Sequence, residues 1–139
     1  PDYESISELS KFCFVPLTVG GGINKIEQVD KLIEIGADKV SINSASYEDP
    51  EIISNVANRF GKQCVIASID VRFEKNEWIC YKNSGLKRTN KNLLKWAKEL
   101  ESRGAGEILI TSIESISLGR SEDLPPVTPI KLISESDKE

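Results

Sequence analysis

Four short apolar runs alternate along this chain with stretches of helical periodicity, and this alternation restricts the fold more than any other feature. The runs, which we predict to be strands, are residues 15–19, 39–43, 64–69 and 107–111. The stretches between them repeat apolar residues at helical spacing and end at Gly36, Gly61 and Gly104, glycine being a common helix stop. Repeated strand–helix units imply a parallel sheet with right-handed crossovers. The sequence therefore predicts an α/β fold, either a doubly wound sheet or a (β/α)8 barrel of which four strands would be half.

Further elements are expected around these strands. Residues 5–12 are predicted to form the end of a helix, and residues 44–47 a loop. Residues 71–74 and 77–81 are predicted to pair as a hairpin across the turn Lys75-Asn76. An antiparallel hairpin is thus expected to extend from the end of the third strand.

Two asparagines stand at expected helix starts. Asn24 and Asn90 are predicted to cap the helices that follow them, because their side chains accept hydrogen bonds from the first free N–H groups. The basic run Lys87, Arg88 and Lys91 is interpreted as the exposed start of the second of these helices.

The last part of the chain has a different composition. From Ser115 onward prolines, serines and acidic residues replace the strand–helix pattern. We therefore predict a folded domain over residues 1–114 and an irregular or disordered tail over residues 115–139.

Composition excludes several classes of function. The 139 residues carry a formal net charge of -4, so neither nucleic acid nor an anionic membrane surface is an expected partner. No stretch approaches the roughly 18 apolar residues of a membrane span, and we expect a soluble, cytoplasmic protein. The chain has no histidine, which removes Ser-His and Cys-His nucleophile pairs and the usual zinc ligands. Its three cysteines show no paired spacing, so reduced thiols are favoured over a disulfide or a metal site.

Three consecutive glycines, Gly20 to Gly22, follow the first predicted strand. Glycine reaches positive φ freely, and its N–H groups can turn toward an anion at the start of the next helix. A phosphate-binding loop and a simple tight turn are equally compatible with this tripeptide.

Polar residues end the other predicted strands. In parallel α/β folds the active site lies at the carboxyl ends of the strands, where this chain has Asn43 with Ser44, then Asp70, then Thr111 with Ser112. Amide and hydroxyl donors beside a glycine loop suit a phosphate, although the same residues often cap loops. A carboxylate directly after an apolar strand suits general acid–base catalysis, although it is a cap about as often.

Two charged residues begin strands and therefore lie at the opposite edge of the sheet. They are Lys39 and Glu107, and a salt bridge between them is the favoured interpretation on sequence alone, since that edge usually serves stability.

Four stretches together resemble the cyclase subunit family of imidazole glycerol phosphate synthase. They are Pro-Leu-Thr-Val-Gly-Gly-Gly-Ile at 16–23, Gly-Ala-Asp-Lys-Val-Ser-Ile-Asn-Ser-Ala at 36–45, Ile-Asp at 69–70 and Gly-Ala-Gly-Glu-Ile-Leu-Ile-Thr-Ser at 104–112. The resemblance implies a partial TIM (β/α)8 barrel, strands three to six. It also implies ammonia supplied by a glutaminase partner and used to close an imidazole ring on a bisphosphorylated ribulosyl substrate in histidine biosynthesis. No metal or organic cofactor is implied.

The resemblance also assigns roles to individual residues. Asp70 matches one of two catalytic aspartates of this lyase family. The residues that match ligands of one substrate phosphate are Gly21, Gly22, Asn43 and Ser44. Lys39 and Glu107 match residues at the ammonia entrance, and Gln63 matches a residue at the glutaminase-facing end. Possible substrate contacts are assigned to Thr111 and Ser112.

The chain also departs from the family pattern. The second catalytic aspartate belongs on a strand that precedes this stretch, and the family's Asp-Arg-Asp-Gly-Thr loop is replaced by residues 114–118. We therefore expect this chain alone to be inactive, and a half barrel to associate with itself through exposed strand edges. Two alternatives stay open: a cyclase-like ammonia-channelling subunit in sugar amidation for surface polysaccharides, and a non-catalytic phosphate-binding or interaction remnant.

Overall fold

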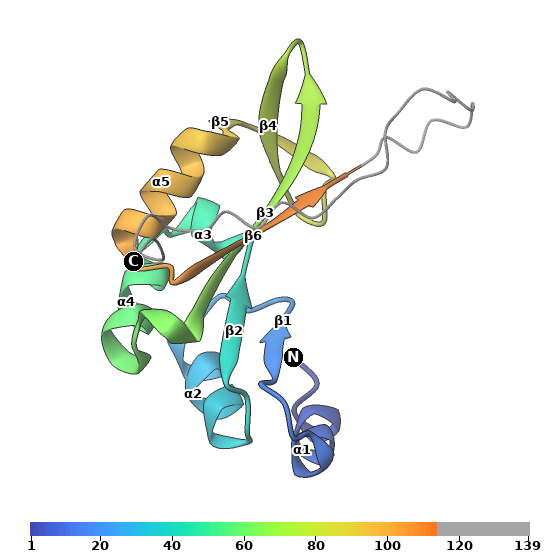
Figure 1. Cartoon of the computed structure of the whole chain (residues 1–139), viewed down its shortest axis with the longest axis vertical. Coiled ribbons are helices and arrows are strands. Elements are labelled where there is room, and N and C mark those ends of the chain that lie inside the picture. Colours follow the sequence, from blue (N-terminus) through green and yellow to red (C-terminus); the bar gives the residue numbers. More distant parts are fainter. Residues whose placement is uncertain (114–139) are drawn as a thin grey trace, which may run out of the picture.

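The computed structural model describes residues 1–113, and its elements follow the predicted strand–helix alternation (Figure 1). The elements in chain order are α1 (Tyr3–Phe12), β1 (Thr18–Gly20), α2 (Ile26–Glu34), β2 (Lys39–Ile42), α3 (Ala45–Glu48), α4 (Glu51–Phe60), the 3-10 helix η1 (Lys62–Cys64), β3 (Val65–Glu74), β4 (Glu77–Lys82), β5 (Lys87–Asn92), α5 (Leu93–Arg103) and β6 (Glu107–Ser112). The predicted tail, residues 115–139, lies outside the described residues. None of the helices within residues 1–113 is long and apolar enough to cross a membrane.

A parallel sheet of β1, β2, β3 and β6 forms the centre of the molecule. Val40 of β2 pairs with Val65 of β3, and Ile66 of β3 pairs with Glu107 of β6, so neighbouring strands start at nearly the same level. The predicted partial barrel is confirmed: over residues 1–113 the strands form part of an α/β barrel wall whose sheet does not close.

The predicted hairpin is also confirmed, and it is longer than expected. Asp70 and Val71 pair with β4 on one side and with β6 on the other, so β4 continues along the edge of β3 where β2 has ended. The antiparallel strand β5 follows β4. Figure 1 shows the β3–β4 hairpin projecting beyond the parallel sheet. Our interpretation of the basic run as a helix start was wrong, because Lys87, Arg88 and Lys91 lie on β5.

The hydrophobic core lies between the parallel sheet and the helices. Along β2 and β3 alternate side chains face the helices, and those of Val40, Ile42, Val65, Ala67 and Ile69 are almost fully buried. They pack against apolar residues of α2, α4 and α5, which lie on one side of the sheet in Figure 1. The opposite face of the sheet, here called the inner face, is therefore left for polar side chains.

Both predicted asparagine caps were wrong. Helix α2 starts at Ile26, and the Gln28 side chain accepts hydrogen bonds from the backbone N–H groups of Asn24 and Lys25, at 2.8 and 3.0 Å. A glutamine three residues into a helix can reach back in this way. Helix α5 starts two residues later than Asn90 implies, because β5 runs to Asn92, whose side chain accepts from Leu94 N at 3.0 Å.

Two boundaries also differ from the prediction. Residues 44–47 were expected to be a loop, but residues 45–48 form the short helix α3. The first strand begins at Thr18 rather than at residue 15. Pro16 has no N–H to give to a strand ladder, and the N–H of Leu17 is used by the Asp38 side chain at 2.7 Å.

Candidate functional site

Three polar pairs are stacked along the inner face of the sheet. Alternation along a strand places residues two apart on the same face, so Lys39, Ser41 and Asn43 share the inner face. Ser41 and Asn43 meet the neighbouring strand β3, where the hydroxyls of Ser41 and Ser68 are hydrogen-bonded and Asn43 bonds to Asp70. Lys39 reaches across β3 and forms an ion pair with Glu107 on β6. The pairs lead from the amino to the carboxyl edge of the strands.

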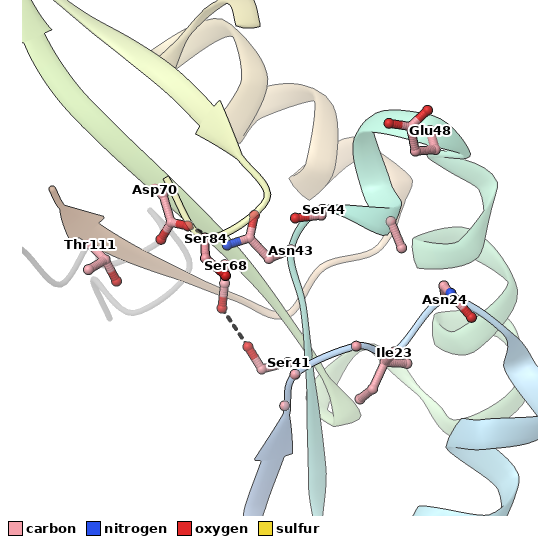
Figure 2. Close-up of a pocket in the computed structure, with 14 residues that line it drawn as sticks. Ile23, Asn24, Ser41, Asn43, Ser44, Glu48, Ser68, Asp70, Ser84 and Thr111 are labelled. Carbon is pink, nitrogen blue, oxygen red and sulfur yellow. Dashed lines mark hydrogen bonds between the residues drawn. The ribbon is translucent and has the colours of Figure 1, made fainter. Parts of the chain in front are cut away.

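A cavity of about 630 Å³ opens at the carboxyl edge of the inner face (Figure 2). It is lined by Gly20, Gly21, Gly22, Ile23, Asn24, Ser41, Asn43, Ser44, Ala45, Glu48, Ser68, Asp70, Ser84 and Thr111. Every strand of the parallel sheet contributes to this lining or adjoins a loop that does. The cavity thus lies at the carboxyl ends of the strands, where the sequence analysis expected the active site of a parallel α/β fold.

The glycine loop forms one wall of the cavity with a backbone that other residues rarely adopt. Gly21 and Gly22 have φ of 99° and 68°, in the left-handed region that favours glycine. No atom lies within 4 Å of the position that a Cβ would take at either residue. The loop ends three residues before Lys25, the N-cap of α2, and leads toward the amino end of that helix. This geometry suits a phosphate wall better than a closely packed turn.

Asp70 lies half-buried on β3, opposite the glycine loop across the cavity (Figure 2). The side-chain amide of Asn43 donates to its Oδ2 at 2.9 Å. Asn43, predicted as a phosphate ligand, therefore uses one amide hydrogen to orient Asp70. An amide nitrogen carries two hydrogens, so the second is still available to a ligand.

Ser44 faces the cavity from the start of α3. Its Oγ accepts a hydrogen bond of 2.9 Å from the backbone N–H of Asn83, in the turn between β4 and β5. Because that bond uses an oxygen lone pair, the hydroxyl proton is free to donate to an anion.

Sequence reasoning did not single out several lining residues, among them Ser41 and Ser68 on the parallel strands and Ser84 and Glu48 outside them. Ser84 belongs to the turn Asn83-Ser84-Gly85, whose three residues all have positive φ. The turn signal Asn-Ser-Gly was readable in the sequence, but its position over the cavity depends on the unpredicted strand β5. Glu48 was missed because residues 44–47 were expected to be loop rather than the start of a helix.

The remaining predicted residues separate between the two edges of the sheet. Thr111 lines the cavity, whereas its neighbour Ser112 does not, since successive strand residues face opposite ways. The predicted salt bridge of Lys39 with Glu107 is confirmed, at the amino edge. Gln63, exposed on η1 just before β3, belongs to that same edge.

Among residues 1–113, no three His, Cys, Asp or Glu side chains are grouped closely enough to hold a metal ion.

Comparison with known proteins gives consistent matches. Residues 1–116 match the family described as histidine biosynthesis protein. The chain is 50% identical over 110 residues to the imidazole glycerol phosphate synthase subunit HisF of Parabacteroides distasonis, a match that covers 79% of this chain and 44% of the relative. It is 45% identical over 123 residues to the putative imidazole glycerol phosphate synthase subunit hisF2 of Campylobacter jejuni, covering 88% of this chain and 49% of the relative. The HisF subunit of Dictyoglomus thermophilum is 50% identical over 111 residues, with 79% and 44% covered. The chain thus spans a little under half the length of these relatives.

Proposed function

The chain belongs to the histidine biosynthesis protein family, a TIM-barrel family, and from this premise we propose that it is part of the cyclase subunit of an imidazole glycerol phosphate synthase. In this proposal a glutaminase partner releases ammonia, which closes the imidazole ring of a bisphosphorylated ribulosyl substrate. The identity of 50% to a subunit of that name supports the assignment.

The observation that carries the proposal is the stack of polar pairs on the inner face. Ammonia is small and forms hydrogen bonds as donor and acceptor, so a path lined by polar groups lowers the cost of leaving water. We propose that it enters beside Lys39 and Glu107, on the edge where Gln63 faces the glutaminase. It then passes the hydroxyls of Ser41 and Ser68 and arrives at Asp70.

The proposed chemistry takes place in the cavity at the carboxyl edge. One substrate phosphate accepts hydrogen bonds from the N–H groups of Gly21 and Gly22 and from the hydroxyl of Ser44. Asp70, with Oδ2 fixed by Asn43, acts as one of a pair of aspartates that take a proton from the attacking nitrogen and return one to the departing oxygen. Thr111 contacts the substrate from β6.

Turnover in this proposal needs more of the barrel than these strands provide, because the sheet over residues 1–113 does not close into a barrel. The test is ring closure from the bisphosphate with ammonium chloride as nitrogen donor. The chain is assayed alone and mixed with a fragment of the Parabacteroides distasonis relative that carries the other barrel strands.

We expect no product from the chain alone and measurable product from the mixture. Asp70→Asn should lower the rate of the mixture by about 10²- to 10⁴-fold, the usual contribution of a general acid–base residue. Glu27→Gln, on the exposed side of α2, is the matched carboxylate control and should leave the rate unchanged. Product from the chain alone would refute the proposal that it is inactive by itself. An unchanged rate of ring closure in the mixture with Asp70→Asn would refute the catalytic role of Asp70.

A further inference from the structure

The charges that line the cavity do not match the ligand proposed for it. Among the lining residues within 1–113, the two that carry charge are Asp70 and Glu48, and both are acidic. A phosphate bound there would face two carboxylates and be held by neutral donors alone. A cationic side chain would strengthen such a site, because charge-assisted hydrogen bonds are about twice as strong as neutral ones.

A cation forms an ion pair with one of these carboxylates. The ammonium of Lys82, the last residue of β4, forms an ion pair with Oε1 of Glu48. Glu48 lies at the end of α3 on the rim of the cavity (Figure 2). The next residue after Lys82 is Asn83, whose N–H is 2.9 Å from the Oγ of Ser44, so this lysine is tied to the proposed phosphate wall.

The two partners of this ion pair are held very differently. The Lys82 side chain is 15% exposed, whereas that of Glu48 is 69% exposed. Because the Glu48 carboxylate is largely exposed, water can solvate it when it leaves the ion pair. The packed stem of Lys82 holds the ammonium in place. A stronger anion can therefore displace Glu48 without moving the lysine.

We propose that Lys82 is a phosphate-binding residue of this cavity, and that it exchanges the carboxylate of Glu48 for an oxygen of the ligand phosphate. This inference rests on the proposed function and names the cation of its phosphate site. Glu48 acts as a competitor that weakens binding of anions too small or too weakly charged to displace it.

The test is calorimetric titration of the chain with inorganic phosphate at low ionic strength. Lys82→Met should weaken binding by about tenfold or more, since it removes a charge-assisted hydrogen bond. Glu48→Gln should strengthen binding by about threefold to tenfold, because it removes the competing charge and frees the lysine. Lys98→Met is the matched control: Lys98 is exposed on α5 and does not line the cavity, and its removal should change affinity by less than about twofold.

Gly22→Val separates failure of this inference from failure of the proposed site, because a valine at φ 68° must distort the glycine wall. Binding by the wild type that is lost in Gly22→Val supports the phosphate site. If Lys82→Met then binds as tightly as Lys98→Met, the site stands and the role of Lys82 is refuted. Lack of change in Glu48→Gln would refute the exchange, and lack of binding by the wild type would refute the site and the inference together.

Discussion

At the scale of single residues, Asn43 links the proposed phosphate site with Asp70, the proposed acid–base residue. It follows β2, lines the same cavity as the glycine loop, and donates to Asp70 at 2.9 Å. One oxygen of Asp70 is thereby fixed, and the other is available to a ligand. A carboxylate oriented by a neighbouring amide is ready for proton transfer without first reorganising its surroundings.

The three cysteines offer a residue-scale prediction. Burial raises the pKa of Cys80 to about 11 and also raises that of Cys64, whereas Cys13 is only partly buried. The thiolate is the reactive form, and its fraction grows only as pH rises toward the pKa. At pH 8 iodoacetamide should therefore label Cys13 at least about tenfold faster than the other two.

Peptide mapping by mass spectrometry after timed labelling checks this ordering. Labelling in urea is the control, where all three cysteines should react at similar rates. Equal rates in the native chain, or a reactive Cys80, would contradict the packing of β4 against the core.

At the scale of elements, the start of α5 distinguishes the sequence-based interpretation from the structure. Asn92 accepts hydrogen bonds from Leu94 N and Lys95 N, whereas Asn90 lies exposed on β5. Asn92→Ala should lower the free energy of unfolding by about 1 kcal/mol, the usual value of an N-cap side chain. Asn90→Ala should change it by less than about 0.5 kcal/mol, as for other surface substitutions.

Urea denaturation followed by circular dichroism measures both variants against the wild type. If Asn90→Ala lowered the free energy of unfolding more than Asn92→Ala does, Asn90 would be the helix cap, as the sequence predicted. That result would contradict the extent of β5.

The elements that the sequence predicted well are those with a buried face. Strands β2, β3 and β6 and helices α2, α4 and α5 were readable because their apolar residues repeat at a fixed period. Strand β5 has none of that signal: its sequence is Lys87-Arg88-Thr89-Asn90-Lys91-Asn92, which contains no apolar residue. Within residues 1–113 it pairs only with β4. Its strand structure is set by tertiary pairing rather than by local propensity.

The cavity residues likewise divide into those that the sequence predicted and those that it did not. Gly21, Gly22, Asn43, Asp70 and Thr111 were predictable because carboxyl ends of parallel strands meet at one edge. Glu48 and Ser84 reach the cavity from a short helix and from a turn held by β5. Only the folded chain brings those elements to the site.

At the scale of the whole molecule, the two edges of the sheet differ in the side chains that they present on the inner face. Charged residues lie at the amino edge, the cavity lies at the carboxyl edge, and the pair Ser41 and Ser68 lies between them. The cyclase proposal requires this polarity, because ammonia and the phosphorylated substrate must arrive from opposite ends.

The most direct test of that polarity is a titration of the isotope-labelled chain with imidazole glycerol phosphate, followed residue by residue by NMR. We predict shifts of the amide signals of Gly21, Gly22, Ser44 and Asn83, and none of those of Lys39, Gln63 and Glu107. Shifts confined to the amino edge, or no shifts at millimolar ligand, would contradict the assignment of the carboxyl-edge cavity as the substrate site.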